Sequence, residues 1–447
     1  MALHGILIFG AGRSASCTIN YLLEKAAQNS LSLTVADADL RNLSAFGDNH
    51  TNATFIKADI HDDAQRQELI KNHEVVISLL PAAFHIIVAK DCLAFGKHLV
   101  TPSYISPEIA LLGKEVSAKN LVFLNEMGLD PGIDHMSAMH IINRLKEEGA
   151  EILSFKSYTG GLVATESDTN PWHYKISWNP YNVARAGQDG AICMVNSEMA
   201  YVSYERLFKE TEIINIENSD SFDAYLNRDS LRYIALYGLE NTGTFIRGTL
   251  RYPGFCKLWN ALVAMGVTSD RLIIENLNKM SLRDFFRMFL SKSEAPFDSK
   301  IKALTSQEWT DKEIRALEWL GVYSTETISL ERGTPVQVLQ QVIEQKWKME
   351  EADKDRVVML HEFIYKIAHQ KFRLRSVMDI NGEDGKRTAM AKTVGMPLAL
   401  AAELILHGKI NTYGVILPTL KGVYEPLLSV LGAFGIGFTE HLEEINE

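Results

Sequence analysis

Short apolar runs alternate with amphipathic stretches along residues 1–127. Six runs have the length and composition of β-strands, and helical patterns separate most of them. This alternation is typical of βαβ units, in which helices connect parallel strands. We therefore predict an α/β fold that begins with a doubly wound parallel sheet, its strands at residues 5–9, 32–36, 54–57, 74–80, 98–101 and 121–125.

The pattern changes after residue 128. A helix expected over 133–148 leads into strands expected at 154–161, 213–216, 233–239 and 244–252, with Asn227 and Arg228 in a loop. Residues 254–355 are mostly amphipathic helix, 359–378 fit two strands around a short turn, and 388–406 form a strongly apolar helix. These patterns predict a second domain with a mixed or antiparallel sheet.

A glycine-rich turn follows the first strand. Gly10 and Gly12 lie in the sequence GAGRSA, ahead of a helix expected over 16–27. In a dinucleotide site the first glycine permits a tight turn, the second lets the backbone approach a pyrophosphate, and Ala15 keeps the helix close to the sheet. Asp37 ends the second strand, where a carboxylate accepts from the adenosine ribose. This context favours a dinucleotide site over an ordinary glycine-rich turn.

Charge and cysteine usage narrow the classes of partner. The chain has 447 residues, 46% of them apolar, and a net charge of -11 without basic runs, which argues against nucleic-acid and membrane partners. Its four cysteines are too widely spaced for a metal site or a disulfide framework, so we expect no metal and a reducing compartment. Because the N-terminus shows no signal-peptide pattern, we expect a cytoplasmic protein.

Two polar motifs follow the fourth and fifth predicted strands. LLPAAFH ends at His85, which either faces a nicotinamide or starts the next helix. TPSYISP holds Ser103 and Ser106, whose hydroxyls either donate to a carboxylate or a ribose or cap a helix. Because the carboxyl ends of parallel strands meet at the ligand-binding edge of such a sheet, both motifs are candidates for the site.

A third motif, NEMGLDPGIDH over residues 125–135, lies where the two predicted domains join. Its acidic residues include Asp130 and Asp134, either of which fits the first turn of a helix. Two glycines, a proline and three carboxylates are nevertheless more than a helix start requires. Since clefts form at domain junctions, we expect this motif to line one.

Together, VVISLLP, SYISP, NEMGLDPGIDH, SYTGGL, YKISWNP and IRGTLRYPGF, with KTVGMP near the end, resemble the saccharopine dehydrogenases that form L-glutamate, also called saccharopine reductases. The likeness covers nearly the whole chain. It implies a Rossmann domain over 1–127, an α/β (α+β) substrate-binding and dimerisation domain over 128–265 and 356–385, a small helical insertion over 266–355, and a segment over 386–447 that returns to the Rossmann domain. It also implies a homodimer.

The resemblance further implies the reaction. A hydride passes between a nicotinamide and the ε-carbon of the lysine-derived part of saccharopine, and water opens the resulting imine to glutamate and 2-aminoadipate 6-semialdehyde. The family's cofactor contacts fall on Ala11, Gly12, Arg13, Ser14, Asp59, Ile60, Ser103, Tyr104, Leu129, Asp130, Pro131 and Ser177. Its substrate contacts fall on Ser103, Tyr104, Asp130, Arg228, Thr249, Leu250 and Arg251.

The chemistry of saccharopine agrees with these assignments. The molecule carries three carboxylates, so an acidic protein needs guanidinium groups to bind it, and Arg228, Arg247 and Arg251 are the candidates, although each also fits a surface ion pair. Proton transfer is assigned first to Asp130 and then to Tyr104, with a bound water as the alternative. Hydride transfer itself needs mostly positioning.

The chain departs from the family pattern at two places. Members that use NADPH have Cys-Arg-Thr after the second strand, whereas this chain has Asp37-Ala38-Asp39. Because Asp37 repels a 2′-phosphate, we favour NAD, with NADP possible from the resemblance. Thr159 stands where such members place a cysteine, and residues 161–166 lack the family's prolines, which leaves the exact substrate open.

Two alternatives stay open. One keeps the fold but changes the substrate to an amine and aldehyde pair, as in carboxynorspermidine or homospermidine enzymes. Such a substrate carries one carboxylate or none and has less use for both Arg228 and Arg251. The other is a dinucleotide-binding protein without turnover.

Overall fold

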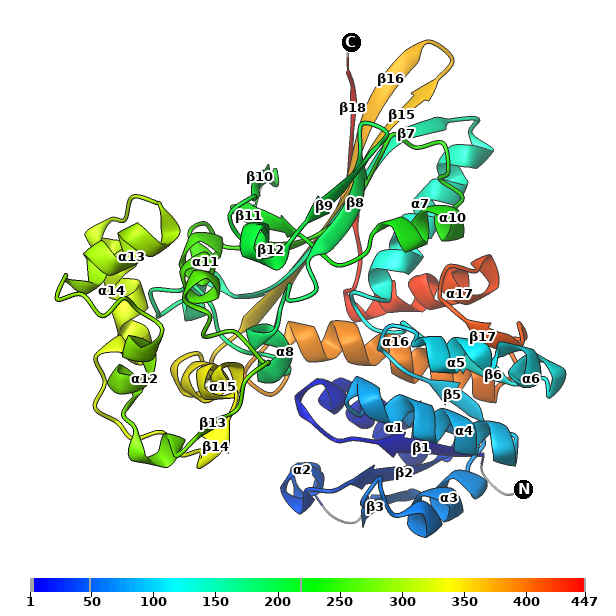
Figure 1. Cartoon of the computed structure of the whole chain (residues 1–447). Helices are drawn as coiled ribbons and strands as arrows, with labels where there is room; N and C mark the ends of the chain where they lie inside the picture. Colours follow the sequence, from blue (N-terminus) through cyan, green and yellow to red (C-terminus); the bar gives the residue numbers. More distant parts are fainter. Residues whose placement is uncertain (1–3, 48–49, 218, 446–447) are drawn as a thin grey trace. The chain divides into compact units, whose positions relative to one another are not determined.

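The computed structural model describes residues 4–47, 50–217 and 219–445 and divides into two compact units (Figure 1). The first comprises Met1–Glu151, Ile367–Gln370 and Val377–Glu440, and the second Ile152–Lys366, Lys371–Ser376 and His441–Glu447. The division after residue 151 differs from the boundary drawn from sequence at 127/128. The reason is that helix α7 (Ile133–Glu147) packs within the first unit, where Asn143 Nδ2 donates to Tyr424 Oη of α17 at 2.7 Å.

The first unit is built on a seven-stranded sheet in the order β17-β6-β5-β4-β1-β2-β3, and every pair of neighbours is parallel. All six runs predicted as strands are strands, which confirms the parallel sheet. The order reverses between β1 and β4, the position at which ligands bind in doubly wound folds. The strands are β1 Gly5–Phe9, β2 Ser32–Asp37, β3 Ala53–Lys57, β4 Val75–Ser78, β5 His98–Val100, β6 Val122–Leu124 and β17 Gly414–Ile416.

Burial explains why these runs form central strands. Every residue of β1, β4 and β6 is buried, as expected for parallel strands covered on both faces. The covering helices include α1 and α16, which run side by side (Figure 1). The helices of this unit are α1 Ser16–Ala27, α2 Leu40–Ser44, α3 Asp63–Lys71, α4 His85–Phe95, α5 Pro107–Leu111, α6 Gly113–Ala118, α7, α16 Ala389–Leu406 and α17 Lys421–Leu431, with 3-10 turns η1 Arg13–Ala15, η2 Ala82–Phe84 and η7 Gly432–Phe434.

Helix α16 is the strongly apolar helix expected near the end of the chain. Among the described residues it alone is long and apolar enough to cross a membrane by length and composition. However, 72% of the window that meets this test is buried in the fold, which is the burial of a core helix. Thr18 Oγ1 on α1 donates to the Gly395 carbonyl of α16 at 3.0 Å. The helix therefore belongs to the core beside the glycine-rich turn.

The second unit is built on a nine-stranded sheet. Its main path is β10-β11-β12-β7-β15-β16-β18, and the β8-β9 hairpin pairs with β12. Strands β12 and β7 are parallel while β10, β11 and β12 are antiparallel, which confirms the expected mixed sheet. The strands are β7 Glu151–Val163, β8 Ala191–Val195, β9 Glu198–Val202, β10 Glu212–Asn215, β11 Ser221–Leu226, β12 Thr244–Arg251, β15 Asp355–Ile367, β16 Gln370–Asn381 and β18 Thr439–Glu444.

Helices cluster in the later part of this unit, as the amphipathic pattern predicts. They pack on an aromatic core in which Phe255 and Trp259 stack with ring centroids 5.8 Å apart and Trp347 lies fully buried beside them. The elements are α8 Pro180–Ala184, α9 Tyr204–Leu207, α10 Ile234–Tyr237, α11 Phe255–Met265, α12 Leu282–Met288, α13 Phe297–Thr305, α14 Asp311–Leu317 and α15 Pro335–Lys346, with β13 Ile274–Glu275, β14 Arg332–Gly333 and the short turns η3 Thr165–Ser167, η4 Leu231–Tyr233, η5 Leu277–Lys279 and η6 Glu318–Val322.

One predicted strand is wrong. Residues 233–239 form the end of η4 and helix α10 instead of a strand. Tyr233 and Tyr237 lie four residues apart, and both are buried with ring centroids 6.1 Å apart, which is helical spacing. Gly238 then ends the helix in the left-handed conformation.

Candidate active site

The glycine-rich turn has the geometry that a dinucleotide needs. Gly10 has φ +99°, and a Cβ there would lie 2.8 Å from the carbonyl oxygen of Leu79, so only glycine fits where the turns after β1 and β4 meet. A Cβ at Gly12, in contrast, would meet nothing within 4 Å. The protein itself therefore leaves open space beside Gly12, which fits the close approach of a pyrophosphate to the backbone. Arg13 and Ser14 follow in the short helix η1.

Asp37 is fixed at the carboxyl end of β2, beside the turn. Its Oδ2 accepts from the Ala11 amide at 2.7 Å, and its Oδ1 accepts from the Asp39 amide at 2.7 Å and from Asn42 Nδ2 at 3.2 Å. A carboxylate has about four acceptor positions, so one remains for a ribose hydroxyl. Two cations lie near: Lys57 of β3 is the register partner of Asp37, and Arg41 pairs with Asp39 at 2.7 Å, where its hydrogen bond lowers the pKa of Asp39 to about 2.

Two further cofactor contacts predicted near this edge, Asp59 and Ile60, follow β3, which lies next to β2. Asp59 Oδ1 accepts from the His61 amide at 2.9 Å, and the carbonyl of Ile60 accepts from Arg66 Nη1 at 2.6 Å. Asp59 is exposed and Ile60 half-buried. The first unit therefore brings Gly10, Asp37 and Asp59 to the carboxyl edge of three neighbouring strands, β1, β2 and β3.

His85 joins hydroxyls from two strand ends. Its Nδ1 lies 2.8 Å from Oγ of Ser78, the last residue of β4, and its Nε2 lies 2.8 Å from Ser103 Oγ and 3.1 Å from Thr101 Oγ1, both after β5. The side chain is 2% exposed, and burial lowers its pKa to about 4, so the imidazole is neutral near pH 7. His85 therefore orients the Ser103 hydroxyl, although it is also the first residue of α4. Ser106, in contrast, caps α5 by accepting from the Ile109 amide.

The buried His85 predicts a pH dependence of stability. Its pKa is lower in the folded protein than the value of about 6.5 expected when unfolded, so the unfolded chain binds more protons as the pH falls from about 6.5 to about 4. We expect His85 to reduce the free energy of unfolding by about 3 kcal/mol over that range. Urea unfolding of His85→Gln at several pH values should show a shallower loss than the unsubstituted protein. The exposed His407→Gln variant should keep the original slope, and equal slopes for all three proteins would contradict the prediction.

Tyr104 and Asp130, the two residues assigned to proton transfer, are in contact. Tyr104 Oη donates to Asp130 Oδ1 at 3.2 Å, and both residues are half-buried. Asp130 lies in a tight turn in which the Gly128 amide donates to the Pro131 carbonyl at 2.9 Å. At Gly132, φ is +148° and a Cβ would lie 2.0 Å from the Gly128 oxygen, so the turn requires glycine. The same turn carries Leu129 and Pro131, both predicted cofactor contacts and both buried.

The two aspartates of this motif have different roles. Asp134 Oδ1 accepts from the Gly132 amide at 2.6 Å, so the helix-start interpretation holds for Asp134. Asp130 instead directs its carboxylate to the Tyr104 phenol. The third acidic residue, Glu126, is fully buried 2.9 Å from His135. Glu126 was counted among the three carboxylates of the motif, but no contact was predicted for its side chain.

The substrate contacts predicted on the second unit include one face of β12. Strand alternation puts Thr249 and Arg251 on one face and the side chain of Leu250, fully buried, on the other, so Leu250 can offer only its backbone to a ligand shared with them. Thr249 pairs with Thr159 of β7 and with Tyr225 of β11. Ser177, a predicted cofactor contact, lies buried in the loop before α8.

Arg251 is a buried guanidinium in an aromatic surround. It is 4% exposed and lies 5.2 Å from the ring centroid of Tyr174 and 5.5 Å from that of Phe255. Nη1 donates to the Leu250 carbonyl at 2.8 Å, whereas Nε is buried without a hydrogen-bond partner among residues 4–47, 50–217 and 219–445. The carboxylate on the opposing strand, Asp223, turns away and accepts from the Gly254 amide at 2.9 Å. The site is therefore one in which a carboxylate ligand would supply the missing charge.

The other two arginines differ from Arg251. Arg228 is exposed, has φ +51°, and lies 3.9 Å from Asp189 Oδ2. A left-handed conformation is uncommon for a bulky residue and recurs at functional sites. Arg247 is buried with its guanidinium 4.5 Å from the ring centroid of Tyr233, which favours a packing role.

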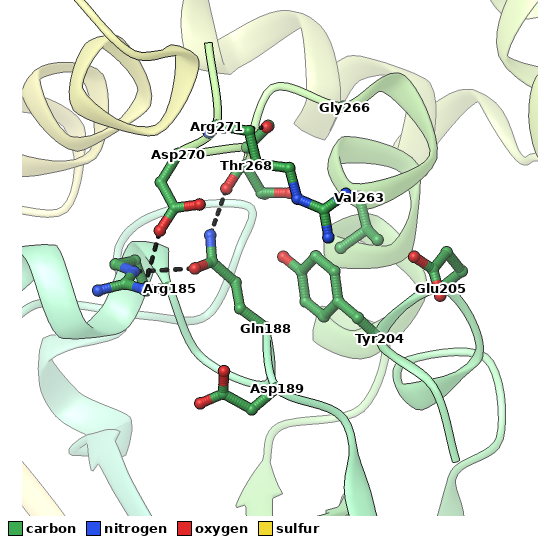
Figure 2. Close-up of a pocket in the computed structure, with 11 residues that line it drawn as sticks. Arg185, Gln188, Asp189, Tyr204, Glu205, Val263, Gly266, Thr268, Asp270 and Arg271 are labelled. Atoms are coloured by element: carbon green, nitrogen blue, oxygen red, sulfur yellow. Dashed lines mark hydrogen bonds and ion pairs between the residues drawn. The ribbon is translucent and has the colours of Figure 1, made fainter.

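A hollow of about 290 Å³ in the second unit holds none of the predicted residues (Figure 2). Arg185 on its wall is paired with Asp270 at 2.8 Å and bonded to Gln188, whose Nε2 donates to the Thr268 carbonyl at 2.5 Å. The lining carries more carboxylates than guanidinium groups, so it is a poor site for a substrate with three carboxylates. Among the described residues, no group of three or more His, Cys, Asp or Glu side chains could hold a metal ion.

Comparison with known proteins finds a matching family model for each of the two parts of the chain. A family model described as the saccharopine dehydrogenase NADP binding domain matches residues 6–130, and one described as the saccharopine dehydrogenase C-terminal domain matches residues 128–436. The saccharopine dehydrogenase (NADP+, L-glutamate-forming) of Schizosaccharomyces pombe is 32% identical over 98% of this chain and 98% of its own length.

Two further relatives extend this likeness. The apo saccharopine dehydrogenase (L-Glu forming) of Saccharomyces cerevisiae has a solved structure that matches with a TM-score of 0.86 and 31% identity, covering 98% of this chain and 100% of its own. The mitochondrial alpha-aminoadipic semialdehyde synthase of Mus musculus is 31% identical over 97% of this chain but only 47% of its own length.

Proposed function

The chain belongs to the saccharopine dehydrogenase family, and from this premise we propose that it interconverts saccharopine with L-glutamate and 2-aminoadipate 6-semialdehyde. The observation that carries the proposal is the buried Arg251 guanidinium, which has no carboxylate partner among the residues that the structure describes. Saccharopine brings three carboxylates, and bidentate guanidinium pairing is the strongest recognition that a side chain offers them. The proposal assigns carboxylate binding to Arg251 and Arg228.

Oxidation of a secondary amine requires one proton transfer and one hydride transfer. The amine must lose a proton so that the nitrogen lone pair can form the C=N bond as the hydride leaves the ε-carbon. Asp130 accepts this proton, and the phenol of Tyr104, 3.2 Å from its Oδ1, orients the carboxylate. Water then adds to the imine, and the Tyr104–Asp130 pair returns a proton to the nitrogen as glutamate leaves. A bound nicotinamide supplies the hydride acceptor.

The residues at the end of β2 lead us to propose a preference for NAD. The Schizosaccharomyces pombe relative has NADP+ in its name, and the matching family model is described as NADP binding. In this chain the Asp37 carboxylate is fixed where a 2′-phosphate would lie, and like charges repel there. Arg41, the cation nearest in sequence, is bound to Asp39. These features favour ribose hydroxyls over a phosphate.

Replacing Asp37 tests this preference. We expect Asp37→Ser to lower kcat/KM with NAD and raise it with NADP, because the variant loses an acceptor for the ribose and a repulsive charge. A change of about 2 kcal/mol between the two nucleotides corresponds to roughly a 30-fold shift in their ratio. Initial rates with both nucleotides measure it. The exposed Glu68→Gln variant removes the same charge from α3 and should leave the ratio unchanged; better use of NADP by the unsubstituted protein would contradict the proposal.

A panel of secondary amines tests the substrate. We propose that saccharopine is oxidised with a kcat/KM at least about 30-fold above that of carboxynorspermidine, because a buried guanidinium left without a substrate carboxylate forfeits about 2 kcal/mol. A higher kcat/KM for the polyamine would favour the related polyamine enzymes. Dinucleotide binding without oxidation of any amine in the panel would favour a protein without turnover.

A further inference from the structure

Glu126 and His135 are buried side chains that the proposed reaction does not use. Both are 0% exposed, and Glu126 Oε2 lies 2.9 Å from His135 Nε2. Glu126 also has φ +56°, the left-handed region that a residue of its size rarely occupies. Burying a carboxylate costs free energy, and so does a left-handed backbone at a bulky residue. A residue that combines both features is retained where the surrounding structure depends on its geometry.

Glu126 binds the chain on both sides of Tyr104. Its amide donates to the carbonyl of Ser103 at 3.1 Å, and its Oε1 accepts from the Ile105 amide at 3.1 Å. The residue between these two bonds is Tyr104, whose phenol reaches Asp130. Two hydrogen bonds from one residue therefore fix the backbone from which the Tyr104 side chain extends.

The segment of Glu126 is anchored without its side chain. The Asn125 amide donates to the Ile416 carbonyl of β17 at 3.0 Å, and the Met127 amide donates to the Thr101 carbonyl at 3.0 Å. Backbone bonds thus hold both neighbours of Glu126 at the end of the sheet. The Glu126 carboxylate in turn contacts the segment 103–105, where its Oε1 accepts from the Ile105 amide.

A second branch of the same cluster leads to Asp130. His135 Nδ1 lies 3.7 Å from Asp134 Oδ2, and Asp134 Oδ1 accepts from the Gly132 amide at 2.6 Å. Gly132 closes the turn that carries Asp130. The cluster Glu126, His135 and Asp134 thus connects the backbone of Tyr104 with the turn of Asp130.

We propose that Glu126 is a positioning residue that holds the Tyr104 phenol against Asp130, and that His135 fixes the carboxylate of Glu126 for this purpose. This inference rests on the proposed function, since it assigns Tyr104 and Asp130 to proton transfer. Hydrogen bonds that fix a reacting group matter because displacements of about 1 Å reduce rates about 100-fold. The role predicts an effect on kcat with little effect on binding.

A double-substitution cycle tests the role. We expect Glu126→Ala to lower kcat roughly 30- to 100-fold with KM values for saccharopine and the nucleotide within about threefold. Glu126→Gln keeps an oxygen for the Ile105 amide and should recover most of the loss. In a Tyr104→Phe background, Glu126→Ala should add less than about a threefold loss, because the group it positions has already been removed. Independent, multiplying losses would overturn the proposal, and so would an unchanged kcat in Glu126→Ala. Glu115→Ala, an exposed change on α6, is the matched control.

A measurement without turnover separates this inference from the proposed reaction. With 3-fluorotyrosine at position 104, the ¹⁹F resonance reports the pKa of the phenol directly. Because a hydrogen bond to a carboxylate favours the protonated phenol, we expect Glu126→Ala, which loosens the contact with Asp130, to lose the phenol proton at a lower pH than Glu126→Gln. The same titration in all folded variants would overturn the positioning role. Lack of saccharopine oxidation by the unsubstituted protein would overturn the proposed function and leave this titration valid.

Discussion

Replacing Arg251 with methionine is expected to lower kcat/KM for saccharopine roughly 30- to 1,000-fold while leaving the folded protein as stable as before or more so. The loss corresponds to about 2–4 kcal/mol, the usual cost of truncating one partner of a buried charge pair. Stability should not fall, because no carboxylate in the described part of the chain pairs with the buried guanidinium, and methionine removes that desolvated charge while keeping contact with Tyr174 and Phe255. Steady-state kinetics and urea unfolding measure the two effects.

Lys175 provides the matched control for a buried cation. Its Nζ pairs with Asp353 Oδ2 at 2.6 Å, and both side chains are largely buried. Lys175→Met should therefore cost about 3–5 kcal/mol of stability by leaving Asp353 unpaired. If Arg251→Met lost stability to a similar extent while its KM for saccharopine stayed unchanged, Arg251 would be a structural cation of the aromatic core and the carboxylate assignment would be wrong.

Asp130→Asn is expected to lower kcat about 100- to 10,000-fold, the range usual for loss of a general base. Tyr104→Phe should have a smaller effect, because the phenol orients Asp130 and Asp130 takes the proton. Asparagine keeps the size of the side chain and can still accept from the phenol, so a loss of rate would report proton transfer. Nucleotide affinity should stay within about threefold.

The pH profile of kcat/KM decides whether the loss at Asp130 is chemical. In the unsubstituted protein the acidic limb should report the base, and that limb should disappear or move in Asp130→Asn. Asp134→Asn changes the neighbouring aspartate, whose carboxylate supports the turn through the Gly132 amide, and should reduce stability more than it alters the limb. An unchanged acidic limb in Asp130→Asn would exclude this residue as the base.

The N-terminal half of the fold follows from local pattern. The run 5–9, the helix Ser16–Ala27 and the strand that ends at Asp37 were all predicted, because apolar runs bounded by glycine and polar residues have few other ways to be buried. The glycine-rich turn is equally local, since φ at Gly10 depends on the turn itself. Residues 233–239 were misassigned because a continuous apolar run over so short a stretch also fits one helical turn, with Leu236 exposed between the two buried tyrosines.

Long-range contacts explain what the sequence did not reveal about the site. The three hydroxyls around His85 come from the ends of β4 and β5, so their convergence depends on how strands pair. Glu126 reaches Ile105 across 21 positions of sequence. Asp223 lies opposite Arg251 on the neighbouring strand but accepts from the Gly254 amide instead of pairing with the guanidinium. A sequence pattern does not show which of two nearby donors a carboxylate binds.

The oxidation of saccharopine by the purified chain, with NAD and NADP side by side, tests the central claim most directly. We expect reduced nicotinamide, L-glutamate and 2-aminoadipate 6-semialdehyde to form in equal amounts, with a higher kcat/KM for NAD. Binding of the dinucleotide without formation of glutamate from saccharopine would contradict the proposed function.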